Sequence, residues 1–316
     1  MITTASAPAV TDTRALPELR QFPLSIVVAT TRPWPEVRCC LDSLYDQARQ
    51  VGAEIIVADG HGKGLPDDVT DRYPGVIWLK KPGGSVFHLR GLAMARARGE
   101  IVAVTEDHCE VTPGWCERTI SAHKEYPTAA AIGGAVENGA TKRLIDWAHF
   151  FLVFGPFTLP IKNGETERIC LQANISYKRR VIPPVVSRLG MMEMLFNEQL
   201  RQWGERLVAD DQLVVYHIQS LGFLRTCATH FHNGRSIAGF RLQTIKRPER
   251  ILRFAGCFML PAVLLWRTVW PICVKRRRLA HALASLHLLA LLVCCHAAGE
   301  LVGYLWGAGH SPSRLR

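Results

Sequence analysis

An acidic triplet that ends in an imidazole is the first group with the composition of a reactive site. Glu106, Asp107 and His108 directly follow the apolar run EIVAVT at residues 100–105. Adjacent carboxylates repel one another, and a divalent cation relieves that repulsion while binding diphosphate oxygens. Oxygen ligands suit Mg²⁺, whereas the imidazole favours Mn²⁺. The triplet therefore predicts a Mn²⁺ or Mg²⁺ site; a solvated acidic turn capping the next helix is the open alternative.

A second pair of carboxylates, Asp210 and Asp211, precedes the apolar run LVV at 213–215. We expect the pair to lie near the start of a helix over Arg206–Ser220. A carboxylate at a helix N-terminus is commonly a cap. One that faces a cleft can instead accept the proton of an attacking hydroxyl. The pattern alone leaves both roles open.

Two histidines and an arginine, His230, His232 and Arg235, occur in HFHNGR after a predicted strand at Phe223–Thr229. Positioned cations and donors stabilise a departing diphosphate, so these side chains are candidates for that role. Packing and hydrogen bonding on a strand edge is the alternative.

The elements that must position these groups alternate along the first part of the chain. Buried-strand runs are predicted at 24–30, 54–59, 76–79 and 100–105, with helices at 36–47, 86–98 and 113–124. Alternation of this kind predicts an α/β fold with a mainly parallel sheet, whose ligands bind beyond the carboxyl ends of the strands. Further strands are expected at 129–136 and 169–177, separated by an irregular segment at 138–168.

The distribution of charge and of cysteines indicates which partners and which redox environment the protein has. The 316 residues carry 38 basic and 27 acidic side chains, a net charge of +11, and residues 246–316 hold eleven basic against two acidic ones, hence +9. Basic charge concentrated beside apolar segments favours a membrane surface over nucleic acid. None of the ten cysteines forms a C-x-x-C pair, which favours reduced thiols. Residues 1–22 lack a secretory signal pattern and are expected to form a disordered tail.

Two apolar stretches, residues 254–274 and 282–299, predict a C-terminal membrane-associated region over 246–316. Arg267 lies within the first stretch, and the basic run 275–278 follows it. Because positive charge stays on the cytoplasmic side, we expect the first stretch to lie in the interface and residues 279–306 to cross. A two-helix hairpin with both ends in the cytoplasm is the alternative.

The ordered motifs together resemble the inverting family 2 glycosyltransferases, which have the GT-A (Rossmann-like) fold with helices on both faces of the sheet. The resemblance covers roughly residues 23–235 and predicts a catalytic domain over 23–245. Its segments are SIVVATTRP (25–33), CLDSLYDQ (40–47), EIIVADG (54–60), RGLAMARARGEIVAVTEDHCEVTPGW (90–115), CLQANISYKR (170–179) and ADDQLVVYHIQSLGF (209–223).

The resemblance implies a nucleotide-sugar donor, with UDP the usual nucleotide. Thr30, Thr31 and Arg32 match positions that line the nucleotide pocket, Asp59 matches the acid that binds the base, and Arg90 matches a basic residue near the diphosphate. A lipid-linked or glycan acceptor is expected, with the catalytic domain on the cytoplasmic face of the inner membrane.

The catalytic positions follow from the same resemblance. The triplet Glu106, Asp107 and His108 stands where the family has Asp-x-Asp, which binds the metal and the donor diphosphate. Asp211 matches the catalytic base, next to Asp210, and Asn174 lies in the strand that faces the sugar and acceptor.

Departures from the family pattern leave alternatives. The chain lacks the Gln-x-x-Arg-Trp motif of processive synthases, so transfer of a single sugar is expected. The altered metal triplet leaves open a catalytically decayed, membrane-anchored binding protein on the same fold. A nucleotidyltransferase is disfavoured because ATTRPWPE contains no glycine-rich, lysine-bearing phosphate loop.

Overall fold

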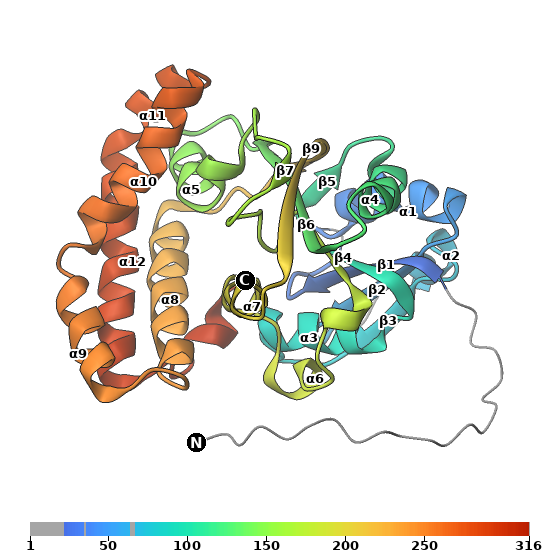
Figure 1. Cartoon of the computed structure of the whole chain (residues 1–316), viewed down its shortest axis with the longest axis horizontal. Helices are drawn as coiled ribbons and strands as arrows, with labels where there is room; N and C mark the ends of the chain where they lie inside the picture. Colours follow the sequence, from blue (N-terminus) through green and yellow to red (C-terminus); the bar gives the residue numbers. More distant parts are fainter. Residues whose placement is uncertain (1–21, 35, 64–66, 316) are drawn as a thin grey trace.

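A nine-stranded mixed sheet forms the centre of the molecule in the computed structural model, which describes residues 22–34, 36–63 and 67–315 (Figure 1). The expected tail at 1–22 lies outside these residues except for Phe22. The strand order is β3-β2-β1-β4-β8-β6-β9-β5, with β7 beside β9. The strands are β1 (Phe22–Thr30), β2 (Glu54–Asp59), β3 (Ile77–Lys80), β4 (Gly99–Glu106), β5 (Cys109–Val111), β6 (Ala129–Asn138), β7 (Gly164–Glu165), β8 (Ile175–Lys178) and β9 (Arg206–His217).

Helices cover both faces of this sheet, which confirms the predicted α/β class. Strands β1 to β4 pair in parallel, whereas β8 is antiparallel to both β4 and β6. Leu41 and Trp115 belong to the apolar core on one face, and Leu89 and Phe196 to the core on the other. The helices in the α/β part are α1 (Arg38–Gln50), α2 (Asp67–Arg72), α3 (Val86–Arg96), α4 (Trp115–Glu125), α5 (Leu144–Phe154), α6 (Val186–Leu189) and α7 (Glu193–Gln202).

The second half of the chain departs from the sequence predictions. Residues Arg206–His217 form strand β9, where a helix was expected, and Phe223–Arg241 form helix α8, where a strand was expected. Burial alternates along the end of β9, since Leu213, Val215 and His217 are buried while Tyr216 is exposed. This period of two is typical of a strand with one covered face. The segment expected to be irregular contains α5, and the predicted strand at 169–177 is confined to β8.

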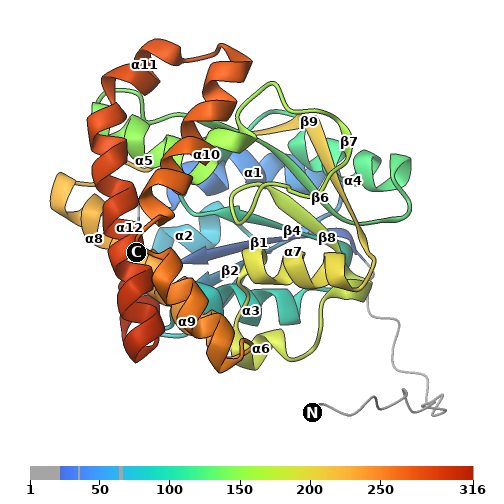
Figure 2. The ribbon, with the colours of Figure 1, turned by 60° about the vertical axis from the view of Figure 1, so that its left-hand side comes forward.

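A layer of helices flanks the sheet on the side of its carboxyl edge (Figures 1 and 2). It consists of α8, α9 (Arg247–Gly256), α10 (Leu260–Lys275), α11 (Leu279–Ala284) and α12 (Leu286–Trp306). Short 3₁₀ turns occur at Gly155–Phe157, Arg179–Val181 and Ser311–Arg314. Helices α9 and α10 are bent by 69° at their junction, and α12 is the one helix in the described ranges that is long and apolar enough to span a membrane by itself.

Helix α12 packs closely against α8 along much of its length. A methyl group added to Gly299 would collide with the carbonyl of Phe231, and one added to Gly234 would collide with the carbonyl of His296. At the far end, Arg235 donates to the carbonyl of Gly307 at 3.0 Å. Glycines at these crossings let the two backbones approach each other. Helix α12 is therefore packed into the folded body, and 44% of its most apolar 18-residue stretch is buried.

The basic run 275–278 also contacts the α/β part. Lys275 donates to the carbonyl of Pro156 at 2.9 Å, and Arg277 pairs with Glu137 of β6 at 3.0 Å. The guanidinium of Arg278 lies over the ring of Trp147, 5.6 Å from its centroid. These contacts attach the basic run to the α/β part of the protein.

Candidate functional site

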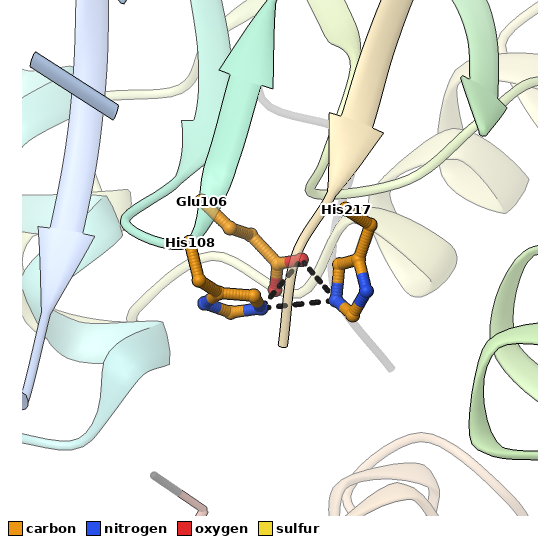
Figure 3. Close-up of side chains that lie close together, drawn as sticks. All are labelled: Glu106, His108 and His217. Carbon is orange, nitrogen blue, oxygen red and sulfur yellow. Dashed lines mark hydrogen bonds and ion pairs between the residues drawn. The ribbon is translucent and has the colours of Figure 1, made fainter. Parts of the chain in front are cut away.

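Three potential metal ligands converge at the carboxyl edge of the sheet (Figure 3). Glu106 ends β4, His108 follows it, and His217 ends β9. Strand β5 brings these chain ends together, because Cys109 pairs with His217 and the Ile218 amide donates to the His108 carbonyl at 2.9 Å. The two Nε2 atoms are 3.0 Å apart, and Glu106 Oε2 lies 3.6 Å from that of His108 and 3.8 Å from that of His217.

This arrangement fits a divalent cation. Ligand atoms bound at about 2.1 Å to one ion are separated by about 3.0–3.5 Å, close to the distances found here. Burial holds the pKa of His217 well below its ordinary value. A neutral imidazole is the form that binds metal. Two nitrogens and one carboxylate oxygen suit Mn²⁺ better than Mg²⁺.

Asp107 orients His108 and is not one of the converging ligands. It is buried; its Oδ1 lies 2.5 Å from His108 Nδ1, and its Oδ2 accepts from Thr30 Oγ1 at 2.6 Å. Burial acts to raise the pKa of Asp107, but the hydrogen bond from His108 and the charge of Arg32 lower it overall. An ionised carboxylate can only accept, so Nδ1 must donate and Nε2 presents its lone pair to the cluster.

The predicted nucleotide residues gather beside this cluster. Thr31 and Arg32 line a cavity of about 880 Å³ that opens at the metal-binding cluster, and Arg32 Nε lies 3.5 Å from Asp107 Oδ1. Asp59, at the end of β2, accepts a hydrogen bond from the His61 amide at 2.7 Å. It lines a smaller adjoining depression together with Thr30, Arg32, Trp34, Val37, His61 and Trp78.

Arg90, a predicted site residue, forms a buried ion pair with Glu193, a residue that the sequence patterns did not single out. Arg90 of α3 donates to Glu193, the first residue of α7, at 2.9 Å, and both line the cavity. Burial raises the pKa of Glu193 even though the charge of Arg90 opposes that effect. Glu193 Oε1 has no hydrogen-bond partner among the described residues. The Phe196 and Leu200 spacing after Glu193 is the signal that could have located α7 and its N-terminal acid.

Asp210 and Asp211 lie elsewhere, and their expected position at the start of a helix is wrong. Asp210 is buried in β9 and bound by Arg118 of α4. Asp211 falls in a bulge, between Asp210 paired with Gly134 and Val214 paired with Ala135. Its carboxylate accepts from the Asn163 side chain at 2.8 Å, and it does not line the cavity. Neither Asp210 nor Asp211 therefore lines the cavity.

The Asn174 side chain also has a structural role. Its amide nitrogen donates to the carbonyls of Ala135 and Leu213, at 2.8 and 3.0 Å, and its oxygen accepts from Trp115. These bonds tie β8 to its neighbours and leave the side chain outside the cavity lining.

The three candidates of HFHNGR lie on helix α8, so their predicted strand-edge position is wrong. His230 lines the cavity and shares a 2.9 Å hydrogen bond with His149 of α5. His232 bonds Ser311 at 3.0 Å, and Arg235 holds the end of α12. On the helix, His230 faces the cavity, whereas His232 and Arg235 contact the C-terminal segment. The packing alternative therefore describes His232 and Arg235.

The cavity extends well beyond the cluster. Its volume is about 880 Å³, and it runs from the sheet edge to the C-terminal helices. The polar end contains Glu106, His108 and His217. The outer end is formed by residues in or next to α5, α9 and α10, among them Leu152, Val153, Cys257, Leu260, Leu264 and Arg267. The cavity is large enough for a nucleotide-sugar together with part of an acceptor.

Comparisons with known proteins agree with this architecture. Residues 25–183 match the profile of the family described as "Glycosyl transferase family 2". A mannosyltransferase from Pyrobaculum calidifontis, solved with GDP-Man and Mn²⁺, is 17% identical, with a TM-score of 0.53 over 90% of this chain and 87% of the other. S. aureus TarS 1-349 is 13% identical, with a TM-score of 0.49 over 89% and 91%. No curated protein sequence matches the chain.

Proposed function

Because this chain belongs to glycosyl transferase family 2, we propose that it moves one sugar from a nucleotide-sugar donor to an acceptor hydroxyl with inversion. The fold is the expected GT-A fold. The observation that best supports the proposal is the convergence of Glu106, His108 and His217 where parallel strands end. Sites of open α/β sheets lie at this edge.

The donor end is assigned from contacts around the cluster. Glu106, His108 and His217 would hold Mn²⁺, with Mg²⁺ the alternative. When bound, the cation offsets the negative charge that develops on the departing diphosphate. Arg32, whose Nη2 lacks a partner among the described residues, faces the same oxygens. Thr30 and Thr31 border the nucleotide, and Asp59 receives its base in the depression beside Trp34 and Trp78.

We assign the acceptor proton to Glu193 in place of Asp211. Glu193 lines the cavity and has a free carboxylate oxygen, whereas Asp211 is hydrogen bonded outside it. A raised pKa makes the ionised carboxylate a stronger base, and Arg90 keeps it in place. The acceptor oxygen attacks the anomeric carbon opposite the leaving diphosphate, and its proton passes to Glu193.

The protein would work at the cytoplasmic face of the inner membrane as an interfacial enzyme. Large apolar side chains are exposed along the C-terminal helices, namely Ile251, Leu252, Phe258, Met259, Val263, Trp266, Trp270, Val274, Leu283, Leu286, Leu291, Leu305 and Trp306. Both ends of α12 contact the folded body, through Trp147–His281 beside its start and His232–Ser311 beyond its end. These contacts favour attachment to one leaflet over the crossing at 279–306 or the hairpin.

A donor screen tests the function. The purified protein is incubated with UDP-, GDP- and dTDP-sugars and Mn²⁺, and nucleoside diphosphate release is measured. GDP-mannose is included because the Pyrobaculum protein was solved with it. Release from one donor, lost in EDTA, is expected. Tight nucleotide binding without release from any donor would support the decayed binding protein.

A further inference from the structure

The outer part of the cavity contains two arginines that lack an acidic partner. Seven arginines line the cavity, and five of them pair with a carboxylate. The pairs are Arg32–Asp107, Arg90–Glu193, Arg201–Glu167, Arg241–Glu300 and Arg253–Glu249. Within the described ranges, Arg168 and Arg267 take part in no such pair. Among the described residues that line the cavity, Arg168 and Arg267 are therefore the arginines without a carboxylate partner.

These two arginines reach that place from separate elements. Arg168 lies in the segment before β8, and Arg267 lies in the middle of α10. Both residues are exposed to solvent where they line the cavity. Partial burial and the positive charge of Arg267 together lower the pKa of Arg168. Two like charges facing one space are stabilised by an anion that accepts from both. The position of Arg267 also accounts for a charge within an otherwise apolar segment.

The walls beside the arginines are apolar and continue to the exposed face of the helical layer. Leu152 and Phe157 line one wall, and Leu260 and Leu264 of α10 line the other. The opposite side of α10 exposes Trp266 and Trp270, which stack at 4.8 Å between ring centroids. Tryptophan is enriched where proteins meet the headgroup region of a bilayer. Helix α10 therefore separates the cavity from the surface that would lie against lipid.

We propose that the acceptor is a phosphate-bearing membrane lipid with a hydroxylated headgroup. Arg168 and Arg267 bind its phosphate, and the first hydrocarbon units lie between α5 and α10. The headgroup hydroxyl extends toward Glu193 and the metal-binding cluster. In the transfer step, the bond between the anomeric carbon and the diphosphate oxygen breaks as the hydroxyl oxygen bonds to that carbon. The proton goes to Glu193, and the nucleoside diphosphate leaves. This inference rests on the proposed glycosyl transfer.

Lipid binding without donor provides a test that is independent of turnover. The full-length protein is titrated calorimetrically with dihexanoyl-phosphatidylglycerol below its micellar concentration, and with dihexanoylglycerol and glycerol 1-phosphate as the two partial probes. The intact probe is expected to bind at least tenfold more tightly than either fragment. Arg168→Gln and Arg267→Gln should each weaken it about tenfold or more, since each removes charge-assisted hydrogen bonds.

Matched variants distinguish loss of this phosphate site from a general loss of positive charge and from misfolding. Arg225 is exposed on α8 and does not line the cavity, so Arg225→Gln should bind the probe like the wild type. Arg267→Lys should recover part of the affinity. Leu264→Asn should weaken the intact probe and leave glycerol 1-phosphate unchanged. Thermal unfolding of each variant identifies any that fails to fold.

The outcomes are distinguishable from failure of the proposed function. If Arg168→Gln and Arg267→Gln lower the affinity for nucleoside diphosphate but not for the lipid, the arginines belong to the donor and the inference is overturned. Equal binding of dihexanoylglycerol and the phosphate-bearing probe overturns it as well. An absence of nucleotide release from every donor contradicts glycosyl transfer, while the lipid titration still decides whether the phosphate site exists.

Discussion

The two ends of the cavity are built in different ways. At the sheet edge, Asp107 is bonded to Thr30 and His108, and its charge is balanced by Arg32. At the outer end, Arg168 and Arg267 have no carboxylate partner among the described residues, and apolar side chains of α10 are exposed. The inner end is preorganised by strand pairing, as catalysis by fixed charges requires. The outer end is suited to a ligand or surface that supplies the missing anion and covers the apolar face.

Removing a cluster ligand should have the largest effect, because the inner end is proposed to act through one ion. In Glu106→Gln and His217→Ala, Mn²⁺-dependent nucleotide release should fall by about 10³-fold or more, equivalent to losing several kcal/mol of charge stabilisation. Release is measured at saturating donor across a range of Mn²⁺ concentrations. His310, exposed and outside the cavity, provides the matched control His310→Ala, which should retain activity.

Removing the proposed base, Glu193, should have the next largest effect on activity. Glu193→Gln should lower kcat by about 10²-fold or more while leaving nucleotide affinity within a few-fold, because an amide cannot accept the proton. Asp211→Asn should remain close to the wild type. The reverse pattern in the two variants would return the role of base to Asp211.

The pH profile provides an independent check on Glu193. Its pKa is raised in the folded protein, and the base acts only when ionised, so kcat should fall as pH drops through that raised pKa. The acid limb should lie above the ordinary range for glutamate and should disappear in Glu193→Gln. A wild-type profile that stays flat down to pH 4.5 would contradict the assignment.

At the outer end, replacing both stacked tryptophans should weaken membrane attachment. Trp266→Ala with Trp270→Ala removes two large exposed rings, and partitioning onto phosphatidylglycerol vesicles should fall roughly tenfold. Sedimentation with the vesicles measures the bound fraction. Trp203, equally exposed but at the end of α7, is the matched control. Equal losses in Trp203→Ala and the double variant would mean that α10 is not the attached face.

A further prediction concerns how the helical layer is held to the body. Gly299→Ala places a methyl group against the carbonyl of Phe231 and should reduce the free energy of unfolding by about 1–3 kcal/mol. Gly256, at the end of α9, has open space around it, so Gly256→Ala should be neutral or slightly stabilising. Denaturant unfolding compares the two variants. Equal stabilities would contradict the close contact of α8 and α12.

Sequence patterns predicted the nucleotide half of the fold well. The strand predicted at 54–59 matches β2, and those predicted at 24–30 and 100–105 correspond to β1 and β4. Each is a buried apolar run ended by polar residues or glycine, a signal that depends on local sequence alone. The sheet edge, and with it Glu106 and His108, follows from the parallel topology.

The remainder depended on distant contacts. In α8, Gly234 and Gly239 weaken the helical pattern, yet Gly234 allows close approach to α12 and Gly239 to Ala308. His217 joins the cluster only because β5 pairs with β9, and no local spacing connects it with Glu106. The exchange of helix and strand over 206–229 moved Asp211 to the wrong place. Long-range pairing, which periodicity does not encode, therefore decided the positions of His217 and Asp211.

Binding of Mn²⁺ by the purified protein shows whether Glu106, His108 and His217 form a metal site. Electron paramagnetic resonance can follow a Mn²⁺ titration of the wild type and of His217→Ala, with and without UDP and GDP. We expect one bound ion per chain with nitrogen couplings and tighter binding when the nucleoside diphosphate is present. Both features should be lost in His217→Ala. Undiminished binding in that variant, or a spectrum without nitrogen ligands, would contradict a metal site formed by Glu106, His108 and His217.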